Sequence, residues 1–228
     1  MKKVKVVTVG LCALTMVGMG CSTKAGTGAL IGTGSGTAVG ALIGALAGNT
    51  AVGAAVGAAV GAGAGALIGK HMDKVAAETA AQVKNGKVEE VTDANGLKAV
   101  KVTFDNGILF PVGKYALQAA AKNELSKFSN VLKNNADLQV DIQGYASSDG
   151  SNEVNQVLSN NRANSVKAYL VNTCGVPSSQ IKSSRGFGET NLITNADGTE
   201  NVKASRRVEV YLYASQAMID KANAGQLN

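Results

Sequence analysis

The sequence predicts an α/β two-layer sandwich of the order β-α-β-α-β-β in its C-terminal half, preceded by a Gly-rich helical hairpin. Two observations support this prediction. Gly and Ala crowd residues 25–69, whereas nearly all charged and aromatic residues of the 228-residue chain lie beyond residue 70. In that second part, segments that alternate apolar and polar residues are interleaved with two segments of helical periodicity, which is typical of one domain with a single core.

Residues 1–20 have the organisation of a secretory signal. A lysine-containing start is followed by an uncharged apolar run that is too short for a good membrane-spanning helix. The small residues Gly18 and Gly20 then precede Cys21, and this arrangement resembles the lipobox of bacterial lipoproteins, with Gly18 where that family usually has Leu. The resemblance implies that the signal is removed and that Cys21 is acylated. The alternative is a plain secretory signal with an incidental Cys.

The cysteine count and the charge argue against a disulfide-bonded protein and against a nucleic-acid-binding protein. Cys12 leaves with the signal and Cys21 carries lipid, so only Cys174 remains and no intramolecular disulfide is expected. With no nearby His to activate it, Cys174 is expected to be a buried structural thiol. The net charge of +6 shrinks when the signal lysines leave, and aromatic residues are few, so nucleic acid is not an expected partner.

The Gly-rich segment 28–69 keeps a four-residue register. Its glycines lie at Gly28, Gly32, Gly36, Gly40, Gly44 and Gly48, and then at Gly53, Gly57, Gly61, Gly65 and Gly69. This spacing places them on one helical face, although each Gly costs about 1 kcal/mol relative to Ala in a water-exposed helix. Close helix contact inside a membrane would offset that cost.

We therefore expect two antiparallel helices, Ala29–Gly48 and Ala51–Gly69, that turn at Asn49-Thr50 and follow a short linker over residues 21–27. Each half is close to the ~20 residues that span hydrocarbon. The segment resembles the glycine zippers of several envelope proteins, which implies contact with membrane lipid and self-association into a homo-oligomer. The alternative is a flexible Gly/Ala linker.

A connecting helix is expected within residues 70–86. Charged and apolar residues from His71 to Lys84 have mixed helical spacing, and Asn85-Gly86 is a good stop signal. His71 is the only histidine, and at the end of an apolar helix it is more typical of an interfacial or capping residue than of a metal ligand. No metal site is predicted.

The domain itself is predicted over residues 87–213, with a tail over 214–228. Its expected elements are a hairpin of strands 87–91 and 97–104 around an Asn-Gly turn, a helix over 117–132, a strand over 138–142, a helix over 153–171, a strand over 181–187 and a last strand over 208–212. Four of the strands, all except 181–187, are indicated by alternation, and the first helix by apolar residues three and four apart.

Five runs of this region carry a family resemblance. They are Phe104–Phe110, Asp141–Tyr145, Asn155–Ala163, Gly186–Glu189 and Ser205–Glu209. In order and spacing they resemble the C-terminal domain of OmpA and of Pal-type lipoproteins, over residues 97–213. The resemblance implies noncovalent binding of the diaminopimelate-containing stem peptide of peptidoglycan, without a cofactor. Ser22 after Cys21 also resembles the sorting pattern of outer-membrane lipoproteins.

Asn155, Ser159 and Arg162 are candidate ligand-binding residues. Their spacing of four and three puts them on one face of a helix. A guanidinium can hold a carboxylate through two parallel hydrogen bonds, which suits the free carboxylate of a stem peptide. The alternative is that Arg162 pairs with an acidic neighbour.

The sequence departs from the family in the loop after the third strand. Where the family commonly has His-Thr-Asp, this chain has Tyr145-Ala146-Ser147, so the Asp expected to hold the ligand's ammonium is replaced by Ser147. Asp149 lies two residues further on and could take that role. Either Asp149 or Ser147 holds the ammonium, or the ligand is not the usual one.

These patterns favour a binding protein over an enzyme, because the chain shows neither a catalytic triad nor a metal-ligand spacing. The leading hypothesis is a lipoprotein of the outer membrane that tethers it to the cell wall, with the domain in the periplasm. The alternative is a membrane-active or pore-forming glycine-zipper protein that a wall-binding domain positions.

Overall fold

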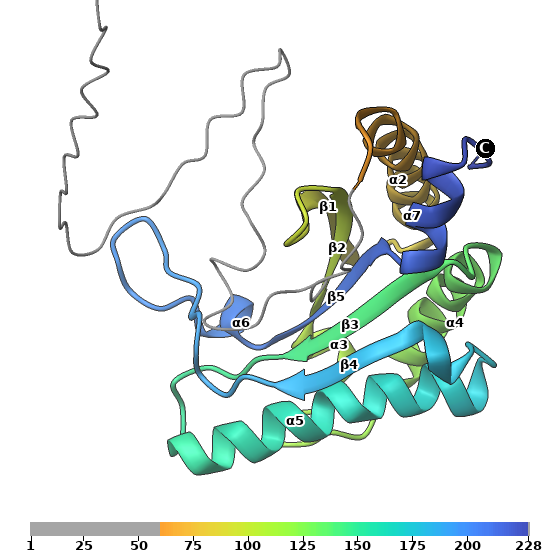
Figure 1. Ribbon diagram of the computed structural model, residues 1–228. Coiled ribbons are helices and arrows are strands. Elements are labelled where there is room, and N and C mark those ends of the chain that lie inside the picture. The colour runs from red at the N-terminus through yellow and green to blue at the C-terminus, as the bar shows by residue number, and fades with distance from the viewer. Residues whose placement is uncertain (1–59, 228) are drawn as a thin grey trace, which may run out of the picture. The chain divides into compact units, whose positions relative to one another are not determined.

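The alternating segments form a five-stranded sheet in the order β1-β2-β5-β3-β4 (Figure 1). This computed structural model describes residues 60–227. The strands are β1 (Gly86–Thr92), β2 (Lys98–Asp105), β3 (Leu138–Gly144), β4 (Ile181–Gly186) and β5 (Arg207–Ala214). Neighbouring strands are antiparallel except β3 and β4, which are parallel. The predicted strands, in their predicted order along the chain, are confirmed.

The turn between β1 and β2 differs in detail from the predicted Asn-Gly turn. Asp93 Oδ1 accepts hydrogen bonds from the backbone N–H groups of Asn95, at 2.8 Å, and Leu97, at 2.9 Å. Gly96 has a φ of 78°, whereas Asn95 does not have a positive φ. A two-residue type I′ turn would need a positive φ at both central residues. The loop is therefore one residue longer than a two-residue type I′ turn, and hydrogen bonds to the Asp93 carboxylate close it.

Two long helices pack on one face of the sheet. They are α4 (Ala119–Asn134) and α5 (Asn152–Ala168), and α5 continues into a π-helical turn over Tyr169–Thr173. Figure 1 shows α5 running along β3 and β4. The apolar side chains of the strands point to these helices, and the rings of Phe104 and Phe128 meet edge to face at 5.9 Å. The two-layer α/β prediction is confirmed. Short helices complete the domain: α3 (Asn106–Leu109), a 3₁₀ turn (Ser178–Gln180) and α6 (Val202–Ser205).

Helix α2 (Ala62–Gln82) belongs to this core. Its Ile68 and Met72 side chains are fully buried in the cluster that also holds the apolar residues of the sheet. The helix passes without a break through residue 69, where the sequence analysis ended the hairpin and began a connecting helix. In its described part, the predicted second arm Ala51–Gly69 therefore packs on the domain.

A second helix outside the predicted elements, α7 (Gln216–Asn223), lies beside α2 (Figure 1). It falls in the segment that the sequence analysis treated as a tail, and it buries Met218 and Ile219. The Asn223 side chain accepts a hydrogen bond from the Gly61 backbone N–H at 3.1 Å, so α7 also fixes the start of α2.

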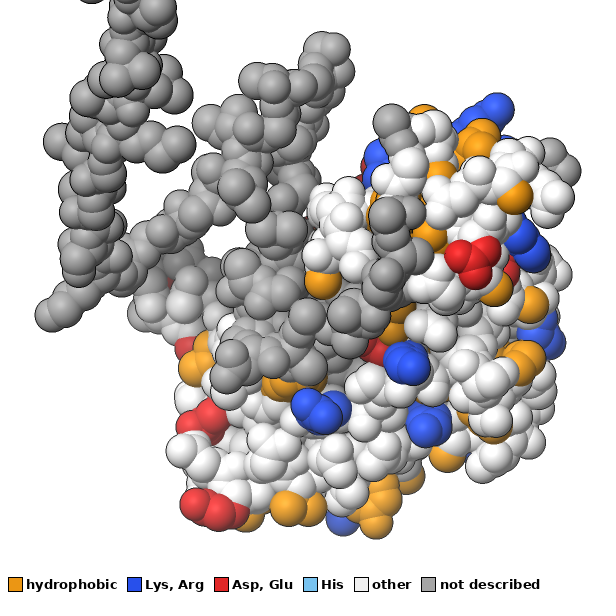
Figure 2. Space-filling model, viewed as in Figure 1, with side chains coloured by type: hydrophobic (Ala, Val, Ile, Leu, Met, Phe, Trp, Pro, Cys, Tyr) orange, Lys and Arg blue, Asp and Glu red, His pale blue; other side chains and the backbone are white. Residues whose placement is uncertain are grey.

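None of the helices described over residues 60–227 is both long and apolar enough to cross a membrane. The signal, Cys21 and the hairpin as far as residue 59 lie outside the described residues and stay predictions. On the face seen in Figure 2, Lys, Arg, Asp and Glu side chains of the described part are scattered among apolar ones.

Cys174 and His71 differ from their expected surroundings. Cys174 is half-buried rather than buried, in the turn that follows the π-helical segment. His71 lies inside α2 and caps nothing, because that helix continues for eleven further residues to Gln82. Its two ring nitrogens are buried and have no hydrogen-bond partner in the described part of the chain.

Candidate ligand-binding site

Two glycines at the ends of adjacent strands position helix α5. A Cβ atom on Gly144 would overlap the carbonyl oxygen of Ser159, and one on Gly186 would overlap the backbone of Asn160 and the Ser159 hydroxyl. The helix backbone therefore rests directly on the ends of β3 and β4. Ser151 caps the helix by accepting a hydrogen bond from the Val154 N–H. The predicted polar stripe is thereby held at the carboxyl end of β3.

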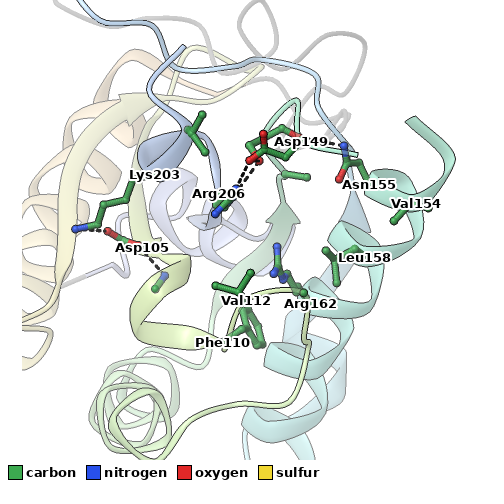
Figure 3. Close-up of a pocket in the computed structure, with 15 residues that line it drawn as sticks. Asp105, Phe110, Val112, Asp149, Val154, Asn155, Leu158, Arg162, Lys203 and Arg206 are labelled. Carbon is green, nitrogen blue, oxygen red and sulfur yellow. Dashed lines mark hydrogen bonds and ion pairs between the residues drawn. The ribbon is translucent and has the colours of Figure 1, made fainter. Parts of the chain in front are cut away.

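A cavity of about 500 Å³ lies at this end of the sheet (Figure 3). Residues of α3, of the loop after it, of the loop after β3, of α5 and of α6 meet around it. The lining residues are Asp105, Gly107, Phe110, Val112, Gly113, Ala146, Ser147, Asp149, Val154, Asn155, Leu158, Arg162, Val202, Lys203 and Arg206. The cavity thus joins segments about a hundred residues apart in the sequence.

Arg162 is the buried cation of this cavity. Its side chain is 2 % exposed, and its Nε donates a hydrogen bond to the Lys114 carbonyl oxygen at 3.0 Å. The guanidinium carbon lies 5.5 Å from the centre of the Phe110 ring, within the range of a cation–π contact. Burial, and next the positive charge of Arg206, lower the pKa of Arg162 to about 10. Arg162 therefore stays charged at neutral pH, inside a partly apolar wall.

Arg206 is a second guanidinium of the cavity, which the sequence analysis did not assign to the site. Its Nε donates a hydrogen bond to the Ser147 hydroxyl at 2.9 Å, and its Nη2 forms an ion pair with the Asp149 carboxylate (Figure 3). The Ser147 hydroxyl donates in turn to Asp149 at 3.4 Å. Ser147, Asp149 and Arg206 thus form one small network on the wall of the cavity.

The neighbouring arginine has a different role, although the two are adjacent in the sequence. Arg207 begins β5 and is buried, with its Nε 2.6 Å from the Glu209 carboxylate. Its guanidinium also lies 4.0 Å from the centre of the Tyr145 ring. The pair Arg206-Arg207 was visible in the sequence, but only the alternation of the strand and the position of α6 decide which of them lines the cavity.

A second ion pair stands at the edge of the cavity. Lys203 Nζ lies 3.7 Å from the Asp105 carboxylate, which also accepts a hydrogen bond from the Gly107 N–H at 2.8 Å. Each carboxylate that lines the cavity is thus paired with a cation that lines it too, and Arg162 adds a further positive charge.

Asn155 and Ser159, from the predicted stripe, fix the surrounding loops. Asn155 lines the cavity, and its amide donates hydrogen bonds to the Ser147 carbonyl oxygen, at 3.1 Å, and to the Glu189 carboxylate, at 3.0 Å. The Ser159 hydroxyl accepts a hydrogen bond from the Gly188 N–H at 2.9 Å. Ser159 is fully buried and is not among the lining residues. The structure therefore brings four of the five predicted ligand residues to the cavity and places the fifth behind it.

Comparisons with known proteins place this domain in a class. Residues 109–207 match the model of the OmpA family, and residues 1–73 match that of the YMGG-like Gly-zipper. The chain therefore carries an OmpA-like domain behind a segment of the glycine-zipper type. Both resemblances expected from the sequence are confirmed.

Two relatives carry the names of a lipoprotein and of an outer membrane protein. Over 111 residues the chain is 33 % identical to the protein of Escherichia coli named "Probable lipoprotein YiaD", covering 49 % of this chain and 50 % of that one. Over 109 residues it is 35 % identical to outer membrane protein A of Serratia marcescens, covering 46 % and 30 %. The chain thus spans half or less of these curated relatives. A MotB-like protein from Desulfovibrio vulgaris shares the fold, with a TM-score of 0.54, 17 % identity, and coverage of 66 % of this chain and 99 % of that one.

Proposed function

We propose that this protein tethers the bacterial outer membrane to the cell wall. In this proposal the OmpA-like domain lies in the periplasm and binds the diaminopimelate-containing stem peptide of peptidoglycan noncovalently, and acylated Cys21 holds the membrane. The family match and the names of the relatives, a lipoprotein and an outer membrane protein, support it. The protein acts as a binding protein and needs neither a cofactor nor a metal for this role.

The observation that carries the proposal is the buried Arg162 in a cavity open to a ligand. Arg162 is 2 % exposed and lines the cavity, so a ligand carboxylate there would meet a desolvated guanidinium and could accept two parallel hydrogen bonds from it. The apolar lining of Phe110, Val112 and Leu158 suits the alkyl chain of a diaminopimelate residue. The ammonium of that residue would face the loop after β3, which carries Ser147 and Asp149.

A titration of the full chain in detergent with a diaminopimelate peptide tests this proposal. Loss of one partner of a desolvated charge pair costs about 2–5 kcal/mol, so Arg162→Ala should weaken binding roughly thirtyfold or more. Arg185→Ala is the matched control, because Arg185 is exposed on β4 and lies outside the cavity. Unchanged affinity in Arg162→Ala, with circular dichroism showing an intact fold, would exclude this site.

The membrane anchor needs a separate test. Cys21→Ser should leave the precursor without fatty acid and with its signal uncut. Because one acyl chain alone binds a membrane only marginally, firm anchoring needs several chains together with the glycine-rich segment. Labelled fatty acid in Cys21→Ser at the level of the parent would exclude the anchor.

The glycine-zipper match supports a second role, in which residues before the domain associate in or on the membrane. The two roles separate by deletion of residues 28–59, which spares α2. Purified sacculi should still capture the shortened chain if the domain alone binds the wall. Loss of capture would favour the membrane-active alternative.

A further inference from the structure

The charges around the cavity are unequal in their exposure. Arg162 is almost completely buried, whereas the Asp149 side chain is 62 % exposed. Asp149 is also already paired with Arg206, whose side chain is 31 % exposed. A ligand carboxylate and a ligand ammonium would therefore meet very different surroundings in the same cavity.

Exposure determines how much each ligand charge can contribute. An ion pair in water-exposed surroundings has a small net effect, because solvent already stabilises both charges and screens their attraction. A ligand ammonium that approaches Asp149 would in addition share that carboxylate with Arg206 and stand beside its positive charge. A ligand carboxylate at Arg162 meets a desolvated guanidinium, and Arg206 adds a second positive charge nearby.

Ser147 occupies the buried position at which a carboxylate would favour binding of a ligand ammonium. Its side chain is 3 % exposed, and its hydroxyl accepts the Arg206 hydrogen bond without adding a negative charge. The most buried charged side chain that lines the cavity is therefore a cation, Arg162, whereas the Asp105 and Asp149 side chains are 32 % and 62 % exposed.

We infer that this cavity recognises the carboxylate of its ligand and is nearly indifferent to a neighbouring ammonium. Its ligands are therefore alkyl chains that carry a carboxylate, with or without an ammonium beside it. The inference rests on the proposed function and refines it. It assigns Asp149 to holding Arg206 in place instead of holding the ligand.

Three matched peptides test this inference on the full chain in detergent. They carry meso-diaminopimelate, 2-aminopimelate or lysine at the same position, with every other carboxylate amidated. At the distal end the first offers a carboxylate and an ammonium, the second only the carboxylate, and the third only the ammonium. We expect the aminopimelate peptide to bind within about fivefold of the diaminopimelate peptide, and the lysine peptide to bind at least about thirtyfold more weakly.

The outcomes separate this inference from the proposed function. If the diaminopimelate peptide binds and the aminopimelate peptide is weaker by tenfold or more, the inference is overturned and the proposed function stands. If none of the three peptides binds and sacculi do not capture the chain, the proposed function fails and takes the inference with it.

Asp149→Asn tests independently whether Asp149 holds the ligand ammonium. Arg206 keeps its hydrogen bond to the Ser147 hydroxyl in this variant, so removing the exposed negative charge of Asp149 should tighten binding of the aminopimelate peptide about two- to threefold, and less at high salt. Asp197→Asn is the matched control, because it changes the net charge equally in an exposed loop outside the cavity. If Asp149 holds the ammonium instead, Asp149→Asn weakens the diaminopimelate peptide tenfold or more and leaves the aminopimelate peptide unaffected. That result would overturn the inference.

Discussion

The two ends of this domain bury different kinds of side chain against the same sheet. Beside α2, α4 and α7 most buried residues are apolar, with Ile68, Met72 and Met218 among them, although Thr79 and Glu124 are buried there too. At the cavity they include Asn155 and Arg162, which need hydrogen bonds from their surroundings. Stability and recognition are thus held by separate groups of residues, and substitutions should affect one without the other.

The largest expected effect is on stability at the apolar end. Ile68→Ala leaves a cavity in the core and should lower the free energy of unfolding by about 2–5 kcal/mol, while the folded fraction keeps its affinity for ligand. Denaturant unfolding followed by circular dichroism measures this. Lys70→Ala, exposed on the same helix, is the control and should change stability by less than about 0.5 kcal/mol. Equal stability of the two variants would show that α2 is not part of the core.

Gly186→Ala should affect both ends. The added Cβ would overlap the Asn160 backbone, so α5 has to shift, at about 1–3 kcal/mol of stability, and Arg162 moves with it. Ligand affinity should therefore fall together with the unfolding midpoint. Gly63→Ala is the control with the opposite sign. A Cβ there meets nothing, and Ala in a helix is favoured by up to about 1 kcal/mol. A Gly186→Ala protein as stable as its parent would show that the close contact under α5 is not needed.

Ser159→Ala distinguishes a supporting residue from a ligand-binding one. It leaves the buried Gly188 N–H without its acceptor, which should cost about 1–2 kcal/mol of stability. Because Ser159 does not line the cavity, the affinity for a diaminopimelate peptide should change less than threefold. A tenfold loss of affinity in a fully folded protein would return Ser159 to the ligand site that its spacing predicts.

The smallest expected effect concerns pH. Burial raises the pKa of Glu124, but the hydrogen bonds from the N–H groups of Lys84 and Asn85, together with the charge of Lys127, lower it by more. The pKa of Glu124 therefore lies below its ordinary value of 4.5. A lowered pKa stabilises the fold above the unfolded value and loses that contribution as pH falls through the folded one. Glu124→Gln should thus cost about 1 kcal/mol at pH 7 and little at pH 3.

Thermal unfolding at the two pH values measures this difference. Glu90→Gln, in an exposed ion pair, is the control, with almost no effect at either pH. A Glu124→Gln deficit that is the same at both pH values would exclude the charge as its cause.

The sequence predicted the central elements because their signals are local. Alternation located four of the five strands, and the spacing of Asn155 and Arg162 located the polar face of α5. The first part of helix α2, as far as Gly69, was assigned to a membrane hairpin because its glycines repeat every four residues, but Ala64 and Ile68 repeat at the same interval on another face. Long-range contacts decide whether the glycine face or the face of Ala64 and Ile68 is packed. One of them is the contact with α7, which lies about 150 residues away in the sequence.

Arg206 was missed for a similar reason. Two adjacent arginines are equivalent in the sequence, and their difference arises only when β5 is paired between β2 and β3. Pairing then buries Arg207 beside Glu209 and leaves Arg206 at the cavity. The role of Ser147 could be suspected from its departure from the family, but its bond to Arg206 spans 59 residues.

The continuity of α2 has a mechanical consequence. Because this helix is part of the core, a pull on the chain before Val60 would enter the domain through the contact of Gly61 with Asn223 and then through Ile68. In the proposed tether, a load on the chain would strain α2 and α7 before it reached α5. The domain would then yield first at these two helices, while the residues around the cavity stayed in place.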